Sequence, residues 1–159
     1  MANAREQLHL FFTNPVLLSC IFSWFSSQLL KTLIKLFSRK VHSVGELFDL
    51  LLWRTGSMPS SHSALVATLC TTIGFRSGVG SDVFILSLGF LLVTVRDAVG
   101  VRRANGIQAR LLNSLGRTLA EKGIMDFKPI KEVQGHTPAE VAIGCLLGFF
   151  IGLAFSVLA

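Results

Sequence analysis

Hydrophobic residues fall into four long runs along the chain, with short polar stretches between them. The runs cover residues 15–37, 59–76, 83–95 and 138–159. At about 1.5 Å of rise per residue, the first and last runs are long enough to cross a bilayer, and the shorter second run can do so when it is packed inside a bundle. No run alternates in the manner of a strand. We therefore predict an all-α integral membrane helical bundle of about four transmembrane helices, formed by residues 1–159 as a single domain.

Two further segments predict short interfacial helices. Residues 44–53 are apolar but too short to cross, which favours an interfacial or re-entrant helix. Residues 105–122 have apolar side chains at 107, 111, 112, 115 and 119, with Arg110, Arg117 and Lys122 between them. This spacing is typical of an amphipathic helix that lies on a membrane surface.

The composition supports a membrane protein. Hydrophobic residues make up 51% of the chain and charged residues only 15%, which is less charge than a soluble domain usually carries. The net charge of +6 comes from basic residues beside the ends of the apolar runs, which favours lipid head groups over nucleic acid as the partner. The cysteines lie inside apolar runs without metal-ligand spacing, and we interpret Cys20, Cys70 and Cys145 as small buried hydrophobes.

The order of the runs predicts which polar stretches meet. If the four helices alternate in direction, residues 54–62, 96–103 and 131–140 all fall on one side of the bilayer. The basic exit of the first run, at Lys31 and Lys35, falls on that side too. An excess of Lys and Arg is typical of the cytoplasmic side, so we expect this polar face to be cytoplasmic.

The first candidate motif is GSMPSSHSA, residues 56–64, between two apolar runs. Pro59 suits the start of a helix, and the serines that follow it can cap that helix. The free amides of a helix start bind anions, and His62 in the first turn can donate a proton to a phosphate ester. The alternative is a serine-rich cap with an incidental histidine.

A second motif, GHTPAEV, starts the last apolar run. His136 and Glu140 are four residues apart and therefore neighbours on one helix face, where a carboxylate can fix the imidazole tautomer and make it a better nucleophile or base. The alternative is a polar pair at a helix start capped by Thr137. Glycines then follow at intervals of four, a pattern that lets another helix approach closely and permits a homodimer through Gly144, Gly148 and Gly152.

The third motif is RDAVGVRRANGIQA, residues 96–109, at the end of the third run. Arginine side chains have the fork geometry that suits phosphate, and this stretch provides Arg96, Arg102 and Arg103. Asp97 is a carboxylate at the membrane edge, where ionisable groups are usually functional. The alternative for these arginines is an ordinary positively charged flank of a membrane helix.

Together, GSMPSSHSA, RDAVGVRRANGIQA and EVQGHTPAEV resemble the divergent branch of the type 2 phosphatidic acid phosphatase superfamily, PAP2, which also includes vanadium haloperoxidases. PSSHS is similar to the phosphate-binding motif Pro-Ser-Gly-His of that superfamily, and His136-x3-Glu140 is similar to its His-x3-Asp motif. Bacterial and plant members of the divergent branch are small membrane proteins. The resemblance therefore implies a bacterial inner membrane or a plastid membrane as the location.

The resemblance also implies a mechanism and a substrate class. His136 would attack phosphorus and form a phosphohistidine, Glu140 would orient it, and His62 would protonate the leaving alcohol. Neither a metal nor another cofactor would be needed. The substrate would be a membrane lipid phosphate such as phosphatidate, phosphatidylglycerophosphate or a polyprenyl (di)phosphate. The predicted phosphate-binding residues are Ser60, Ser61, Arg54, Asp97, Arg96, Arg102, Arg103 and Lys131.

The sequence departs from the superfamily pattern at two places. The first motif, Lys-x6-Arg-Pro, is absent, because Lys31 and Arg39 have the wrong spacing and no proline follows. Ile130 occupies the position at which the third motif has an arginine, with Lys131 next to it.

Two other functions remain open from the residues alone. One is a non-catalytic membrane protein that binds anionic head groups or a phosphorylated partner. The other is a metal-assisted hydrolase with a divalent ion held by His62, Asp97, His136 and Glu140.

Overall fold

The computed structural model describes residues 3–37, 58–132 and 135–158, and these contain helices and no strand. The prediction of an all-α protein is confirmed. The predicted interfacial segment at residues 44–53 lies outside the described residues, as do Arg39 and Arg54. The helices are α1 (Ala4–Phe12), α2 (Pro15–Phe37), α4 (Ser61–Ser77), α5 (Asp82–Arg96), the π-helix η1 (Asp97–Val101), α6 (Arg102–Glu121) and α7 (Pro138–Leu158).

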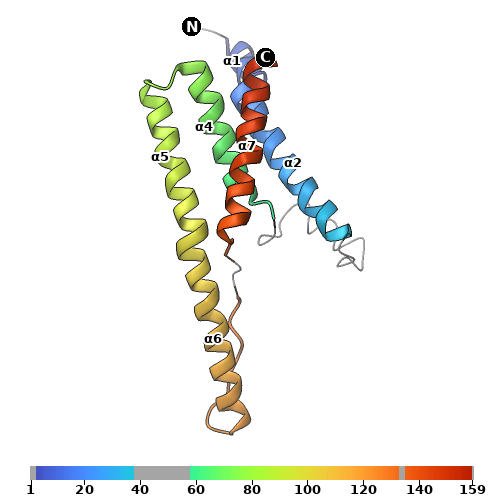
Figure 1. Cartoon of the computed structure of the whole chain (residues 1–159), viewed down its shortest axis with the longest axis vertical. Coiled ribbons are helices and arrows are strands. Elements are labelled where there is room, and N and C mark those ends of the chain that lie inside the picture. The colour runs from blue at the N-terminus through green and yellow to red at the C-terminus, as the bar shows by residue number, and fades with distance from the viewer. Residues whose placement is uncertain (1–2, 38–57, 133–134, 159) are drawn as a thin grey trace.

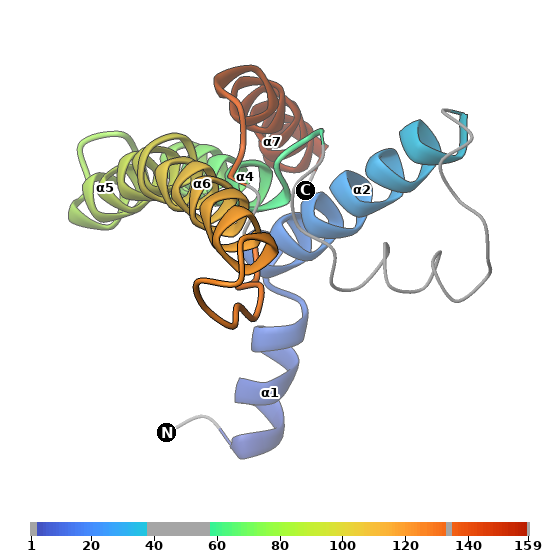
Figure 2. The same ribbon diagram turned by 90° about the horizontal axis from the view of Figure 1, so that it is seen from below.

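Three of the described helices are long and apolar enough to cross a membrane: α2, α7 and the continuous helix Asp82–Glu121. The fourth predicted membrane helix is α4, whose 17 residues span about 25 Å. It packs against α2, α5 and α7 and so lies in the middle of the bundle, as the view from below shows (Figure 2). A short helix can occupy this position because its neighbours cover it.

The capping residues explain where the helices begin and end. The Oδ1 atom of Asn14 accepts a hydrogen bond from the backbone N–H of Val16 at 2.9 Å, so Asn14 satisfies a free amide at the start of α2. Pro15 is the first residue of that helix, where its missing N–H costs nothing. At the C-terminal end of α4, Gly78 has a φ of 83°, a conformation that glycine adopts without strain. The chain turns there into α5.

The glycine stripe of α7 packs against α4 of the same chain. A Cβ atom at Gly144 would lie 2.5 Å from the carbonyl oxygen of Ser60, and one at Gly148 would lie 2.1 Å from that of Ala64. Both glycines and Gly152 are buried. The prediction of close helix approach is confirmed, and the helix that approaches is α4 of the same chain, so the stripe that was expected to permit a homodimer is already covered.

A stripe of small polar side chains joins α2 to α4. Ser19, Ser23 and Ser27 are buried and four residues apart, so they share one face of α2. The hydroxyl of Thr68 donates to Ser23 at 2.8 Å, and the hydroxyls of Ser19 and Thr72 are 3.2 Å apart. Small residues allow close packing in a membrane, and the hydroxyl pairs add hydrogen bonds between the helices.

The third membrane helix continues far beyond the predicted span. α5, η1 and α6 form one helix of 40 residues, about 60 Å long, whereas the hydrocarbon core of a bilayer is about 30 Å thick (Figure 1). Residues 105–122 are helical, as predicted, but the expectation of a separate surface helix is wrong. The polar residues 96–103 contain no proline, and the chain passes through them as a π-helix without leaving the helical path.

The face of α6 that packs within the protein is made of small and polar residues. The buried residues are Gly106, Ala109, Asn113 and Gly116, which face the segment that returns toward α7. The apolar residues of the amphipathic pattern, among them Leu111 and Leu115, are exposed. α6 and the returning residues 122–132 form a projecting arm (Figure 1).

The described helices run in alternating directions, as the sequence pattern predicted. The N-terminus, the turn between α4 and α5 and the C-terminus lie at one end of the bundle (Figure 1). The first turns of α4 and α7 meet at the other end, where the backbone N–H of Ser60 donates to the carbonyl of Glu140 at 3.0 Å. η1 contacts α7 at this end. Three polar stretches that are distant in sequence thus come together.

We predict that Gly148→Ala destabilises the fold because the new methyl group would collide with the backbone of α4. Overpacking of this kind costs about 1–3 kcal/mol. Thermal unfolding of the purified protein in detergent, followed by tryptophan fluorescence, measures the loss. Gly89→Ala is the matched control, since nothing lies within 4 Å of a Cβ atom at Gly89 in α5. Equal melting temperatures for the two variants would contradict the packing role of Gly148.

Candidate functional site

The first turn of α4 forms one wall of the site. The hydroxyl oxygen of Ser60 accepts hydrogen bonds from the backbone N–H of Ser63 at 3.4 Å and from its hydroxyl at 2.9 Å, so Ser60 caps the helix. The backbone N–H of Ala64 is bonded to the carbonyl of Ser60. The amides of Ser61 and His62 therefore remain at the open end of α4, where the helix dipole favours an anion.

The first turn of α7 fixes Glu140 and, through it, His136. Glu140 and Thr137 form a capping box: the carboxylate accepts from the backbone N–H of Thr137 at 3.0 Å, and the hydroxyl of Thr137 accepts from the backbone N–H of Glu140 at 3.3 Å. The same carboxylate oxygen, Oε2, lies 3.1 Å from Nδ1 of His136. Because a carboxylate only accepts, Nδ1 carries the proton and the electron pair is on Nε2. His136 is only 5% exposed, which limits other orientations of its ring.

The π-helix η1 brings Asp97 and Arg102 onto one face. In an α-helix, residues five apart are turned by about 140° from each other and cannot pair. The i→i+5 hydrogen bonding of η1 widens the turn, and the Nε atom of Arg102 donates to Oδ2 of Asp97 at 2.5 Å. Asp97 thus fixes the direction of the Arg102 guanidinium.

Lys31 of α2 is a site residue that the sequence analysis did not include. Its side chain is only 1% exposed, and its ammonium donates to the hydroxyl of Ser61 at 2.9 Å. It also interacts electrostatically with Glu140. A lysine inside an apolar span is the signal that could have identified it, because charged groups in a membrane helix are costly and usually face a polar interior.

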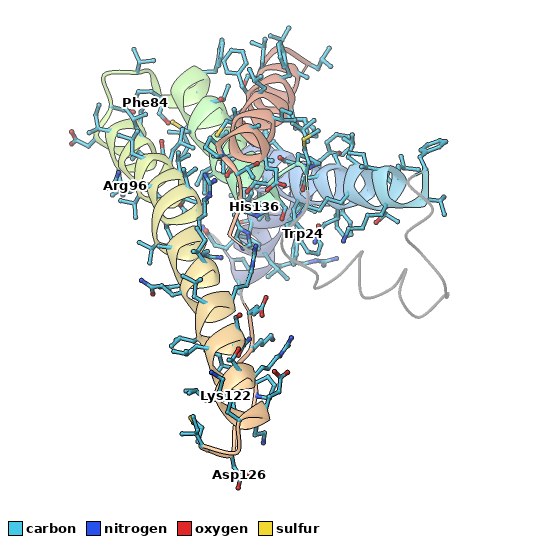
Figure 3. All side chains as sticks on the ribbon, turned by 60° about the horizontal axis from the view of Figure 1, so that its bottom comes forward. Trp24, Phe84, Arg96, Lys122, Asp126 and His136 are labelled. Carbon is cyan, nitrogen blue, oxygen red and sulfur yellow. The ribbon has the colours of Figure 1, made fainter. Side chains whose placement is uncertain are left out.

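His62 is exposed in the first turn of α4. The charges of Arg102, Lys31, His136 and Asp97 act on it electrostatically. The two histidines belong to the starts of α4 and α7, which meet where the backbone N–H of Ser60 donates to the carbonyl of Glu140. Figure 3 shows His136 where α7, α2 and the long helix meet. We call this group the polar cluster; it consists of Lys31, Ser61, His62, Asp97, Arg102, His136 and Glu140.

The other predicted phosphate ligands lie around this cluster or away from it. Arg96 is exposed and lines a shallow hollow with Leu92, Val93, Asp97 and Val101, and Figure 3 labels it on the long helix apart from His136. The side chains of Arg103 and Lys131 are exposed. Ser60 is buried and serves as the cap of α4. Among the predicted arginines that the structure describes, Arg102 is thus the one whose charge acts on His62.

The alternative of a metal site is not supported by the geometry of the described residues. Among them, no group of three or more His, Cys, Asp or Glu side chains is arranged to hold a metal ion. The four proposed ligands His62, Asp97, His136 and Glu140 therefore do not form a coordination site. The carboxylate of Asp97 is paired with Arg102, and that of Glu140 is paired with His136. Both carboxylates therefore orient a neighbouring side chain.

The arm connects the long helix to His136. The amide of Asn113 donates to the carbonyl of Ile130 at 3.0 Å and to the carboxylate of Glu132 at 2.9 Å, and its oxygen accepts from the N–H of Ile130 at 2.9 Å. A Cβ atom at Gly116 would lie 2.3 Å from the ring of Phe127, and one at Gly135 would lie 2.3 Å from the backbone of Arg103. These contacts hold the returning chain on α6 up to the residue before His136.

Comparison with known proteins agrees with this arrangement of motifs. Residues 12–151 match the sequence profile of the divergent PAP2 family. The chain is also similar to the uncharacterized membrane protein YuiD of Bacillus subtilis (strain 168), with 36% identity over 158 residues that cover 91% of this chain and 95% of that protein. No solved structure matches the chain.

We predict that Asn113→Ala loosens the returning segment, because three hydrogen bonds are lost and the backbone N–H of Ile130 loses its acceptor. Such a loss costs about 1–3 kcal/mol of local stability. Hydrogen–deuterium exchange of residues 127–132, read by mass spectrometry, should become faster. Asn105→Ala, on an exposed position of the same helix, is the control and should leave exchange there unchanged. Similar exchange in the two variants would rule out the role given to Asn113.

Proposed function

Since the chain belongs to the divergent PAP2 family, we propose that it is a membrane phosphatase that hydrolyses a phosphomonoester or diphosphate of a lipid through a phosphohistidine. The observation that supports this most strongly is that two histidines with different environments belong to helix starts that meet. His136 is buried and oriented by Glu140, whereas His62 is exposed in the first turn of α4, where free amides can bind an anion. This difference suits one imidazole as nucleophile and the other as proton donor.

The reaction we propose has two steps. In the first, Nε2 of His136 attacks phosphorus, the bond from phosphorus to the ester oxygen breaks, and protonated His62 gives its proton to the leaving alcohol. In the second, a water molecule attacks the phosphohistidine, and neutral His62 takes a proton from this water as the phosphorus–nitrogen bond breaks. Inorganic phosphate leaves, and both imidazoles return to their initial states. Glu140 holds the Nδ1 proton of His136 throughout, which keeps the nucleophilic electron pair on Nε2.

The phosphate oxygens require positive charge and N–H donors. The amides of Ser61 and His62 and the guanidinium of Arg102 can provide both. Lys31 adds a second cation, and we propose that it replaces the lysine of the missing Lys-x6-Arg-Pro motif. Asp97 acts on phosphate only through Arg102, which it orients. Arg96, Arg103 and Lys131 remain predicted ligands outside the polar cluster, and Arg54 remains a predicted ligand that lies outside the described residues.

The polar cluster surrounds the starts of α4 and α7, and Arg102 lies about 30 Å along the helix Asp82–Glu121, so a lipid head group at the membrane boundary can reach it. A lipid phosphate is therefore the substrate class that we propose. The positive residues at this end favour the cytoplasmic face, and the similarity to a membrane protein of Bacillus favours a bacterial inner membrane over a plastid membrane.

We predict that His136→Ala lowers phosphate release from a lipid phosphate by at least about a thousandfold, because the nucleophile is lost. Activity should persist in EDTA, since the proposed mechanism uses no metal. His9→Ala is the matched control, because His9 is exposed on α1 at the other end of the bundle. With a substrate labelled on phosphorus, the wild-type protein should carry an acid-labile label at His136. Lipid binding without turnover, unaffected by His136→Ala, would instead support a non-catalytic binding protein.

We also predict that Lys31→Met lowers kcat/KM by about 10–100-fold, because a charge-assisted contact worth about 1.5–3 kcal/mol is lost. Methionine has a similar length and fits an apolar span, so the fold should be retained, which thermal unfolding checks. Lys122→Met, at the exposed end of α6, is the control and should leave kcat/KM unchanged. Equal kcat/KM values for the two variants would remove Lys31 from the site.

A further inference from the structure

An apolar groove runs along α4 between α5 and α7. Both helices pack along α4, and the space between them encloses about 510 Å³. Its floor includes Ala67 and Cys70 of α4, and its walls include Leu91 of α5 and Leu146 of α7. We call this space the α5–α7 groove. The polar cluster lies beyond its end, at the starts of α4 and α7.

The depth of the α5–α7 groove can be estimated along α4. Ala67 is five residues from His62, and Phe75, which lines the far end, is thirteen residues from it. At about 1.5 Å per residue, the groove therefore extends from about 7 to about 20 Å from the first turn of α4. One leaflet of the hydrocarbon core is about 15 Å deep. The groove thus continues past the middle of the bilayer.

The far end of the groove is shaped by a glycine. A Cβ atom at Gly74 would lie 2.9 Å from the ring of Phe84, so glycine lets this ring lie close to α4. Val79, in the turn between α4 and α5, also lines this end. The groove therefore reaches the turn that lies opposite the polar cluster, at the other end of the bundle (Figure 1).

Charge and shape together indicate the occupant. The polar cluster offers Lys31, Arg102 and a helix start to an anion, and the groove below it offers only an apolar lining over most of its length. An amphiphile with a phosphate head and a hydrocarbon chain matches both parts. A second apolar cavity, lined by Leu69 and Leu86, lies on the opposite face of α4 and provides no continuation of this groove.

We propose that the α5–α7 groove binds the hydrocarbon chain of the substrate, and that the preferred substrate is a phosphate with a single chain longer than one leaflet is deep, of the polyprenyl type. The chemistry at the phosphate rests on the function proposed above. The position of the chain rests on the groove alone. A two-chain lipid would place only one of its chains in the groove and would leave the other in the bilayer.

Binding can be tested without turnover through Cys145, which is half-buried in the wall of the groove. The purified protein is treated with an apolar maleimide, and alkylation is measured for each cysteine by mass spectrometry. Polyprenyl phosphate should slow alkylation of Cys145 severalfold, whereas hexyl phosphate should not. Cys20, half-buried on α2, is the internal control and should react at the same rate in both cases. Equal alkylation of Cys145 with and without polyprenyl phosphate would overturn the proposal.

Turnover provides the second test. Leu146→Trp, which narrows the groove, should lower kcat/KM for polyprenyl phosphate by about tenfold and leave hexyl phosphate unaffected, because a misfitting apolar group in a pocket lowers kcat/KM by about this factor or more. Leu86→Trp places the same side chain in the second cavity and should change neither value.

Hydrolysis of phosphatidate as fast as that of polyprenyl phosphate would refute the single-chain preference. If the wild-type protein released no phosphate from any substrate, the proposed function would fail, and protection of Cys145 would still decide whether the groove binds a chain.

Discussion

The close approach of α7 to α4 is the constraint on which the site depends. Glycines at three successive turns of α7 leave no room for a side chain against α4. At the end of this interface, the carbonyl of Glu140 accepts a hydrogen bond from the cap residue of α4, and the carboxylate of Glu140 holds both the cap of α7 and the ring of His136. Glu140 therefore takes part both in the contact between α4 and α7 and in the orientation of His136. A wider interface would separate the two histidines even if every motif remained intact.

The buried polar residues of α2 have a related role. Hydroxyl pairs between α2 and α4 satisfy each other in an environment without water, and they keep the two helices close enough for Lys31 to reach Ser61. A charged side chain in a span is costly, and the cost is offset here by hydrogen bonding and by the nearby carboxylate of Glu140. The site thus gains a cation that no contiguous sequence motif provides.

Much of this architecture could be predicted from the sequence. The apolar runs predicted four helices, and the residues that begin α2, α4 and α7 have the cap and proline chemistry that marks a helix start. Alternating helix directions then predicted that the motifs at His62 and His136 would face the same side. The features that could not be predicted depend on how helices are rotated and on where a π-turn lies. Without knowledge of η1, Arg96 and Arg102 are equivalent candidates for binding phosphate. The π-helix lets Arg102 pair with Asp97, and the charge of Arg102 acts on His62. Whether Lys31 belongs to the site similarly depends on which face of α2 packs on α4.

The length of the helix Asp82–Glu121 has a consequence for any movement of the arm. Only about half of its roughly 60 Å fits within the hydrocarbon core. Arg102 lies about 30 Å along the helix, near the point where it would leave the bilayer, and the returning chain rejoins the bundle there at Gly135. A tilt of the helix about this point would displace the tip of the arm far more than the guanidinium of Arg102. Arg102 therefore lies where movement of the arm would change the position of its charge least.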